Sequence, residues 1–208
     1  MNIRAGQSTP RPYRMVARAD AAEATGARIL EAARREFGEL LYDQVSLKAV
    51  ADRSSVTVQT VIRRFGSKES LFAAAAQRRS DEIRRQRDAA PAGDIAAATR
   101  VLIDSYERWG DEQLHLLAQE RRTEAMGATV ASGRRYHRAW VERVFAPWLD
   151  GRAAQHRKRL TAQLVAVTDL YTWRVFRRDL GLSRVETEAA VRDLVERLTA
   201  AAGEPQRR

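Results

Sequence analysis

The stretch SLKAVADRSSVTVQTVIRRF, residues 46–65, decides the fold of this chain. Ser46 and Thr57 each precede residues that fit a short amphipathic helix, and both carry a hydroxyl that can accept a hydrogen bond from a helix N-terminus. The stretch therefore predicts two helices, residues 47–53 and residues 58–65, with these two residues as N-caps.

The two predicted helices must cross closely. Ala51 supplies the small side chain that such a crossing requires, and Ser54 and Ser55 supply a tight turn four residues later. Four apolar side chains close a small core beneath the helices: Val50, Val56, Val61 and Phe65. This spacing is typical of a helix-turn-helix.

Residues 56–62, VTVQTVI, also carry the signature of a strand, because they are rich in β-branched residues and alternate in polarity. No partner strand lies nearby in the sequence, and an isolated strand cannot satisfy its backbone hydrogen bonds. The helical interpretation is therefore favoured.

The packing leaves the polar side of the second helix facing outward, where it fits the major groove of B-DNA. Gln59 can pair with adenine, Arg63 or Arg64 with guanine, and Thr60 can touch a thymine methyl group. The residues expected to contact phosphates are Ser46, Lys48, Thr57 and Lys68. The predicted partner is a double-stranded DNA operator.

A family pattern runs through residues 27–71. It consists of Phe37, Tyr42, Ala51, Val56-Thr57, Thr60-Val61 and Phe65-Gly66-Ser67-Lys68-Glu69. These residues resemble the DNA-binding domain of the tetracycline-repressor-like (TetR) family. The resemblance implies an all-α homodimer. Three N-terminal helices would bind DNA, and a larger C-terminal domain would bind a small-molecule effector and form the dimer interface.

Three positions depart from that pattern. Ile62 stands where the family often has a tyrosine that contacts a phosphate, so this contact is expected to be lost. Leu41 and Ser55 stand where glycine is usual, and a Cβ makes a left-handed backbone more costly there.

The organisation expected along the chain is a flexible basic arm (1–20), a helix-turn-helix DNA-binding domain (21–67) and a helical ligand-binding and dimerisation domain (68–208). Pro10 and Pro12 are expected to prevent a helix in the arm. Beyond a Pro-Ala-Gly linker at 91–93, apolar periodicity and breaking residues predict helices at about 94–109, 112–125, 134–148, 154–180 and 184–201.

Aromatic and polar residues of the C-terminal half are candidates for an effector pocket: Tyr106, Trp109, His115, Tyr136, Trp140 and Trp173. The predicted helix 154–180 is apolar on more than one side, and the helix after it has an apolar stripe along one side. The two are expected to form half of an intersubunit four-helix bundle, and the alternative is that they only cover their own subunit. The candidates for this dimer contact are Leu164, Tyr171, Leu194 and Leu198.

Composition narrows the functional classes. The net charge of +10 favours a polyanionic partner, and the absence of cysteine excludes disulfides and thiolate sites. The three histidines lack metal-ligand spacing, and there is neither a phosphate-binding glycine loop nor a nucleophile elbow. We therefore expect no enzyme activity, no cofactor and no metal. No apolar run is long enough to span a membrane, so a cytoplasmic location is expected.

The function that the sequence favours is a sequence-specific transcriptional regulator. We expect a repressor that leaves a palindromic operator when a small molecule binds, with two recognition helices about 34–36 Å apart. One alternative is a non-specific or architectural DNA-binding protein. Another is a helical module whose basic face meets an acidic protein.

Overall fold

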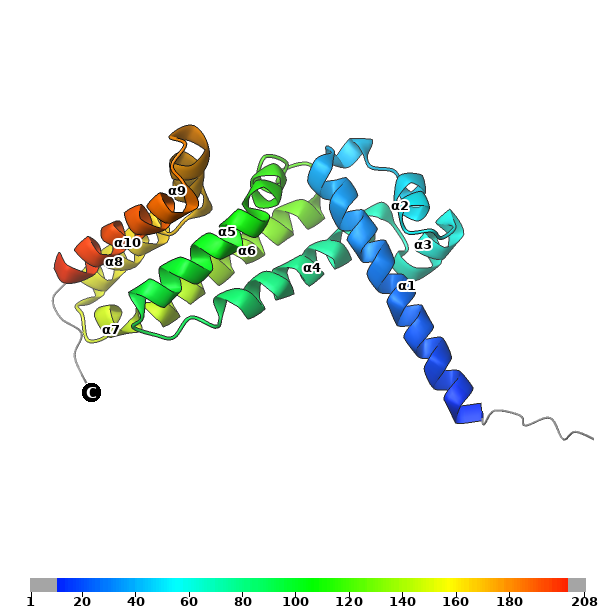
Figure 1. The fold of residues 1–208 in the computed structure, drawn as a ribbon, viewed down its shortest axis with the longest axis horizontal. Helices are drawn as coiled ribbons and strands as arrows, with labels where there is room; N and C mark the ends of the chain where they lie inside the picture. Colours follow the sequence, from blue (N-terminus) through cyan, green and yellow to red (C-terminus); the bar gives the residue numbers. More distant parts are fainter. Residues whose placement is uncertain (1–10, 202–208) are drawn as a thin grey trace, which may run out of the picture. The chain divides into compact units, whose positions relative to one another are not determined.

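The computed structural model describes residues 11–201, and every regular element within them is helical (Figure 1). The described residues form two compact units, which are divided between Ala75 and Ala76. The first unit contains α1 (Arg11–Glu39), the short 3-10 helix η1 (Tyr42–Gln44), α2 (Leu47–Arg53), α3 (Val58–Phe65) and the beginning of α4 (Lys68–Arg87). The predicted all-α fold class is confirmed.

Helix α1 begins ten residues earlier than the sequence suggested. The expected flexible arm covers residues 1–20, but residues 11–20 are helical, and residues 1–10 lie outside the described residues. Pro12 falls in the first turn of α1, where a backbone N–H has no partner within the helix, so proline removes no hydrogen bond there. The expectation of a flexible arm is therefore wrong for residues 11–20, which belong to α1.

Helices α2 and α3 have the predicted boundaries and caps. The Ser46 hydroxyl accepts a hydrogen bond from the Ala49 backbone N–H at 3.1 Å, and the Thr57 hydroxyl accepts one from the Thr60 N–H at 3.2 Å. Of the four residues expected in the core, Val50 and Val61 are buried, whereas Val56 and Phe65 are only partly buried. Ala51, at the helix crossing, is buried as well. The strand interpretation of residues 56–62 is wrong, because all but the first two of them lie in α3.

The turn between α2 and α3 contains backbone strain. Ser55 has a φ of 55°, the only positive φ of a non-glycine residue among residues 11–201, and a left-handed conformation is costly for a residue with a Cβ. We expect Ser55→Gly to raise the free energy of unfolding by about 0.5–1 kcal/mol, measured by urea denaturation. Leu41 is the matched control, since its φ of −63° is unstrained. Leu41→Gly should not raise the free energy of unfolding. An equal rise in both variants would show that the gain does not come from relief of strain at Ser55.

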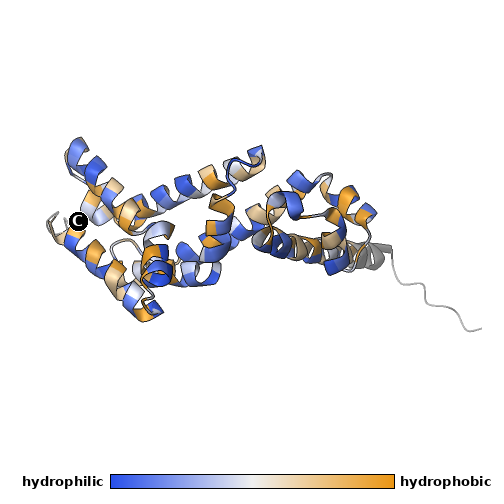
Figure 2. Ribbon diagram, turned by 90° about the horizontal axis from the view of Figure 1, so that it is seen from above, coloured by the Kyte–Doolittle hydropathy of each residue, from blue (hydrophilic) through white to orange (hydrophobic). Residues whose placement is uncertain are grey.

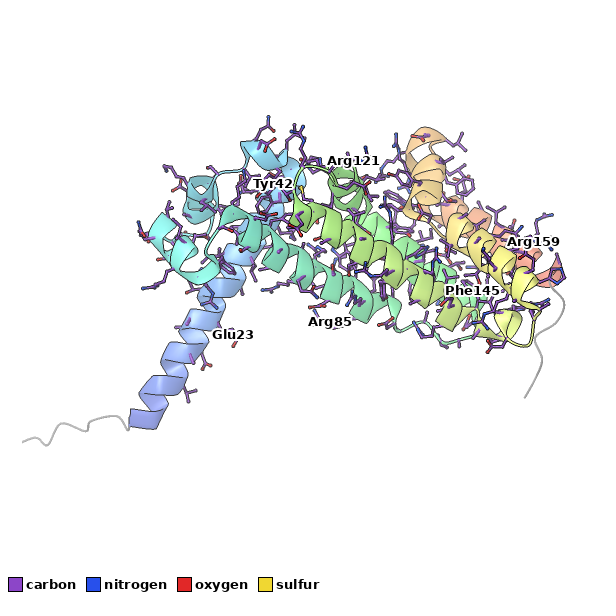
Figure 3. All side chains as sticks on the ribbon, turned by 180° about the vertical axis from the view of Figure 1, so that it is seen from behind. Glu23, Tyr42, Arg85, Arg121, Phe145 and Arg159 are labelled. Carbon is purple, nitrogen blue, oxygen red and sulfur yellow. The ribbon has the colours of Figure 1, made fainter. Side chains whose placement is uncertain are left out.

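The second unit consists of the rest of α4 and the helices that follow it. These are α5 (Ile95–Leu117), α6 (Glu124–Val144), α7 (Ala146–Leu149), α8 (Ala154–Val167), α9 (Leu170–Arg174), the π-helical turn η2 (Val175–Asp179) and α10 (Arg184–Ala201). Hydrophobic and hydrophilic residues alternate along these helices (Figure 2). Helix α10 lies beside α5 and α8, and α6 also packs against α8 (Figure 1). Their apolar sides close a core around Trp140, Trp173 and Phe145, the last of which is labelled in Figure 3.

Several predicted helix boundaries in this unit are wrong. α5 runs straight through Gly110. Glycine stands at this position to make room for the Trp173 indole and does not end the helix, because a Cβ there would lie 2.6 Å from the ring. α6 likewise runs through Gly127 and Gly133. The predicted helix 154–180 is divided instead, because the Asp169 carboxylate accepts a hydrogen bond from the Tyr171 N–H and starts α9.

The final helix follows its predicted signal. The Glu186 N–H donates to the Ser183 hydroxyl at 3.2 Å, and the Ser183 N–H donates to the Glu186 carboxylate at 2.8 Å. This reciprocal pair is the expected capping box, and α10 begins directly after Ser183. Hydrogen bonds to the Glu186 carboxylate from the Ser183 hydroxyl, and then from the Ser183 backbone N–H, lower the pKa of that carboxyl.

No helix within residues 11–201 combines the length and the apolar character that a membrane span needs.

Candidate DNA-binding surface and effector cavity

The outward side of α3 presents Gln59 and Arg63, which are both exposed, together with the partly exposed Thr60. Gln59 and Arg63 are four residues apart in one helix, so their side chains lie on the same side of it. Among the described residues neither side chain takes part in a hydrogen bond or an ion pair. Their polar groups are therefore available to a partner.

Arg64 occupies a different position from the other predicted base contacts. Its guanidinium lies against α1 at Gly26, where a Cβ would force the Arg64 side chain to move, and 6.0 Å from the centre of the Phe65 ring. Arg64 is thus on the flank of α3, separate from Gln59 and Arg63. Sequence reasoning missed Gly26, although a glycine inside a helix is a signal of close packing.

The predicted phosphate contacts are distributed along the same unit. Ser46 and Thr57 are exposed but already cap α2 and α3. Lys48 forms an exposed ion pair with Asp52 at 2.7 Å. The Lys68 ammonium lies 4.4 Å from the centre of the Tyr42 ring, which is labelled in Figure 3, so a cation–π contact holds it beside the N-terminus of α4.

Two further features position the helix-turn-helix, and sequence reasoning identified neither. The Arg53 guanidinium of α2 binds the Glu36 carboxylate of α1 at 2.7 Å, and the Glu36 side chain is only 6% exposed. Gly66 has φ 79° and ψ −71°, and the Ser67 N–H donates to the Phe65 carbonyl at 3.0 Å. This is a tight γ-turn that disfavours residues with a Cβ, and it joins α3 to α4.

A cavity of about 400 Å³ lies within the second unit. Its walls come from the second half of α4 and from α5, α6, α8 and α9. The larger aliphatic side chains of the lining are Ile83, Leu116, Leu117, Val130, Val165 and Leu170. Its size falls in the range of small-molecule sites in proteins.

Two of the six predicted effector residues, Tyr106 and Tyr136, line this cavity. The other four do not. Trp140 and Trp173 are almost fully buried in the core cluster, and Trp109 is buried beside the guanidinium groups of Arg79 and Arg108. His115 is half-buried, and its imidazole contacts Gln119 at 2.8 Å. The sequence indicated the aromatic content of the domain but not which rings border a space.

The cavity also contains polar groups. Arg87 is 3% exposed; its Nε donates to the Ser105 hydroxyl at 3.2 Å, and its guanidinium lies 4.6 Å from the centre of the Tyr106 ring. His137 is 7% exposed, and its Nε2 lies 3.2 Å from the Thr168 hydroxyl. Burial and then the charge of Arg87 lower the pKa of His137 to about 4, so its imidazole is neutral near pH 7.

The predicted dimer contacts differ in how far their side chains are exposed. Leu164 is fully buried within its own subunit, so it cannot touch a partner directly, and this expectation is corrected. Tyr171 is 50% exposed, Leu194 is 37% exposed, and Leu198 is half-buried. The outward side of α8 also carries basic residues, of which Arg159 is labelled in Figure 3.

Comparison with known proteins points to one family. Residues 29–75 match the model of the bacterial regulatory proteins of the tetR family. A tetR-family transcriptional regulator from Streptomyces coelicolor has a similar structure, with a TM-score of 0.69 and 21% identity over 86% of this chain and 82% of that one. A transcriptional regulator from Rhodococcus sp. Rha1 gives a TM-score of 0.67 and 17% identity, over 85% and 96% of the two chains.

A regulator from Saccharomonospora viridis, whose structure was determined in complex with choline, is also similar in fold. It gives a TM-score of 0.59 and 15% identity, over 89% of this chain and all of that one. At these identities the solved structures show a shared fold. A comparison with curated protein sequences gave no significant match.

Proposed function

The chain belongs, through its N-terminal domain, to the TetR family of bacterial regulatory proteins, and on this premise we propose that it is a dimeric repressor of transcription. In this proposal α3 reads a palindromic operator, and a small molecule bound in the second unit releases the DNA. Because its target is DNA, the proposal includes a cytoplasmic location.

The observation that carries the proposal is the outward side of α3. It presents Gln59, Thr60 and Arg63, a short mixed set whose groups match adenine, thymine and guanine. Both side chains that can form bidentate pairs with bases are exposed and without internal partners in the described part of the chain. An architectural DNA-binding protein would need only spread positive charge, so this chemistry favours sequence-specific binding.

Base reading and phosphate binding predict different mutant effects. We expect Gln59→Ala and Arg63→Ala each to weaken binding to the selected operator by about 1–3 kcal/mol while barely changing binding to random DNA. Lys68→Ala should weaken binding to both DNAs about equally and reduce the salt dependence. The operator is first selected from a genomic library, and affinities are then measured by fluorescence anisotropy. Equal losses on operator and random DNA for the two α3 variants would favour the architectural alternative.

The second unit supports the effector and dimer parts of the proposal. The cavity has a suitable size, and one structural relative was solved with a small molecule, choline. Helices α8 and α10 are adjacent and keep Leu194 exposed, which suits a partner surface. Sedimentation equilibrium should give twice the monomer mass of 23.5 kDa. A monomer at the concentrations that bind operator would contradict the dimer.

A further inference from the structure

The cavity in the second unit has an unbalanced set of charges. Its lining contains five arginines: Arg79, Arg84, Arg87, Arg134 and Arg138. Asp169 is the one carboxylate among the lining residues, and its carboxylate already accepts the Tyr171 N–H at 2.9 Å. Arg79 and Arg134 have carboxylate partners in Glu82 and Glu120. The cavity therefore keeps an excess of positive charge.

Among the five arginines, Arg87 is the one whose positive charge is buried and lacks a counter-charge in the described part of the chain. It is 3% exposed, it has no carboxylate partner among the described residues, and its Nη2 has no hydrogen-bond partner. Its contacts to the Ser105 hydroxyl and the Tyr106 ring do not neutralise its charge. Because an isolated buried charge is costly, buried guanidinium groups usually have an anion beside them.

His137 gives a second unsatisfied nitrogen in the same cavity. The Thr168 hydroxyl donates to the Leu164 carbonyl at 2.6 Å, so its lone pairs face His137 Nε2, which must carry the proton. His137 Nδ1 is then a buried acceptor without a partner. The charge of Arg87 disfavours an ammonium group at that place, so the partner of this acceptor would be a hydroxyl or amide group on the body of the bound molecule, separate from the group that binds Arg87.

We propose that the effector is an organic anion, a carboxylate on an apolar body, whose negative group binds Arg87 and whose body fills the apolar part of the cavity. The apolar lining residues accommodate an aliphatic or aromatic body. The anion would give Arg87 the counter-charge that the chain itself does not provide. The inference rests on the proposed effector-binding role of this cavity.

Three probes that share one apolar chain test the proposal: octanoate, octan-1-ol and octyltrimethylammonium. We expect calorimetry to show octanoate binding to the full-length protein about tenfold more tightly than octan-1-ol, with the cation weakest. Arg87→Gln should abolish the preference for octanoate while retaining the binding of octan-1-ol. Arg85→Gln is the matched control, because Arg85 lies on the same helix but is exposed and outside the cavity lining (Figure 3). It should leave the preference unchanged.

Equal binding of octanoate and octan-1-ol, absence of binding by all three probes, or an unchanged preference in Arg87→Gln would overturn the anion site. If Arg87→Gln does not fold, judged by circular dichroism, Arg87→Lys keeps the charge and should retain the preference; its loss in a folded Arg87→Lys protein would also overturn the proposal. Operator affinity with and without each probe is measured separately. Octanoate that binds but leaves operator affinity unchanged would contradict the release mechanism and not the anion site. Release of the operator by octan-1-ol but not by octanoate would contradict the anion site and not the release mechanism.

Discussion

Trp140→Ala should lower the free energy of unfolding of the second unit by about 4 kcal/mol. The Trp140 side chain is 2% exposed, and its Nε1 donates to the Arg87 carbonyl at 3.0 Å. Its ring also lies parallel to the His137 imidazole and edge-to-face with Phe145. The substitution therefore creates a large void and removes one of the two donors to the Arg87 carbonyl, which keeps the Ala90 N–H at 3.2 Å.

Tryptophan fluorescence during urea denaturation is a suitable measurement, because all four tryptophans of the chain lie in the second unit. The variant keeps three of them as reporters. Protein concentration must be held constant, since the proposed dimerisation would contribute to apparent stability. Leu180→Ala is the control, because its side chain is 65% exposed and its loss should change stability by less than about 1 kcal/mol. A comparably small effect of Trp140→Ala would contradict the packing described for this core.

Acid should destabilise the second unit through His137. Its pKa is about 4 in the folded chain and about 6.5 when unfolded, so the unfolded state binds more protons between these values. The stabilisation is complete above pH 6.5 and is lost as the pH falls towards 4, by up to about 3 kcal/mol. His137→Gln should remove most of this dependence of the free energy of unfolding on pH, measured by urea denaturation at a series of pH values.

The control for this pH profile is His156→Gln, because His156 is an exposed histidine of α8. Its profile should follow that of the wild-type protein. Arg34, and to a lesser extent Arg35, lower the pKa of Glu31 to about 2. The stability that Glu31 contributes is therefore lost only as the pH falls from 4.5 towards 2. Glu31 also lies in the first unit, which the tryptophans do not report. A slope that persists in His137→Gln would show that other groups cause the acid sensitivity.

The sequence predicted the helix-turn-helix well because its signals are local. The cap of α2 is the hydroxyl of Ser46 and that of α3 is the hydroxyl of Thr57, and each acts on a backbone N–H three residues away. The same holds for the capping box of Ser183 and Glu186 at the start of α10. Alternation of apolar and polar residues then indicated which side of each short helix is buried.

Features that depend on distant residues were not predicted. Gly110 looked like a helix break, although it makes room for Trp173, which lies far along the chain. Leu164 looked like a dimer contact, but periodicity cannot distinguish a side buried by its own subunit from one buried by a partner. The cavity is also a product of packing among five helices, so no local pattern marked Arg87 as one of its walls.

The most direct test of the account is a double-mutant cycle between α3 and the operator. Gln59→Ala is combined with replacement of each base pair of the selected site in turn, and the binding free energies are compared with those of the wild-type pair. We expect a coupling energy of about 1–2 kcal/mol at one A·T pair in each half-site, and none elsewhere. Zero coupling at every position would mean that Gln59 does not touch a base, and it would contradict the reading of DNA by this side of α3.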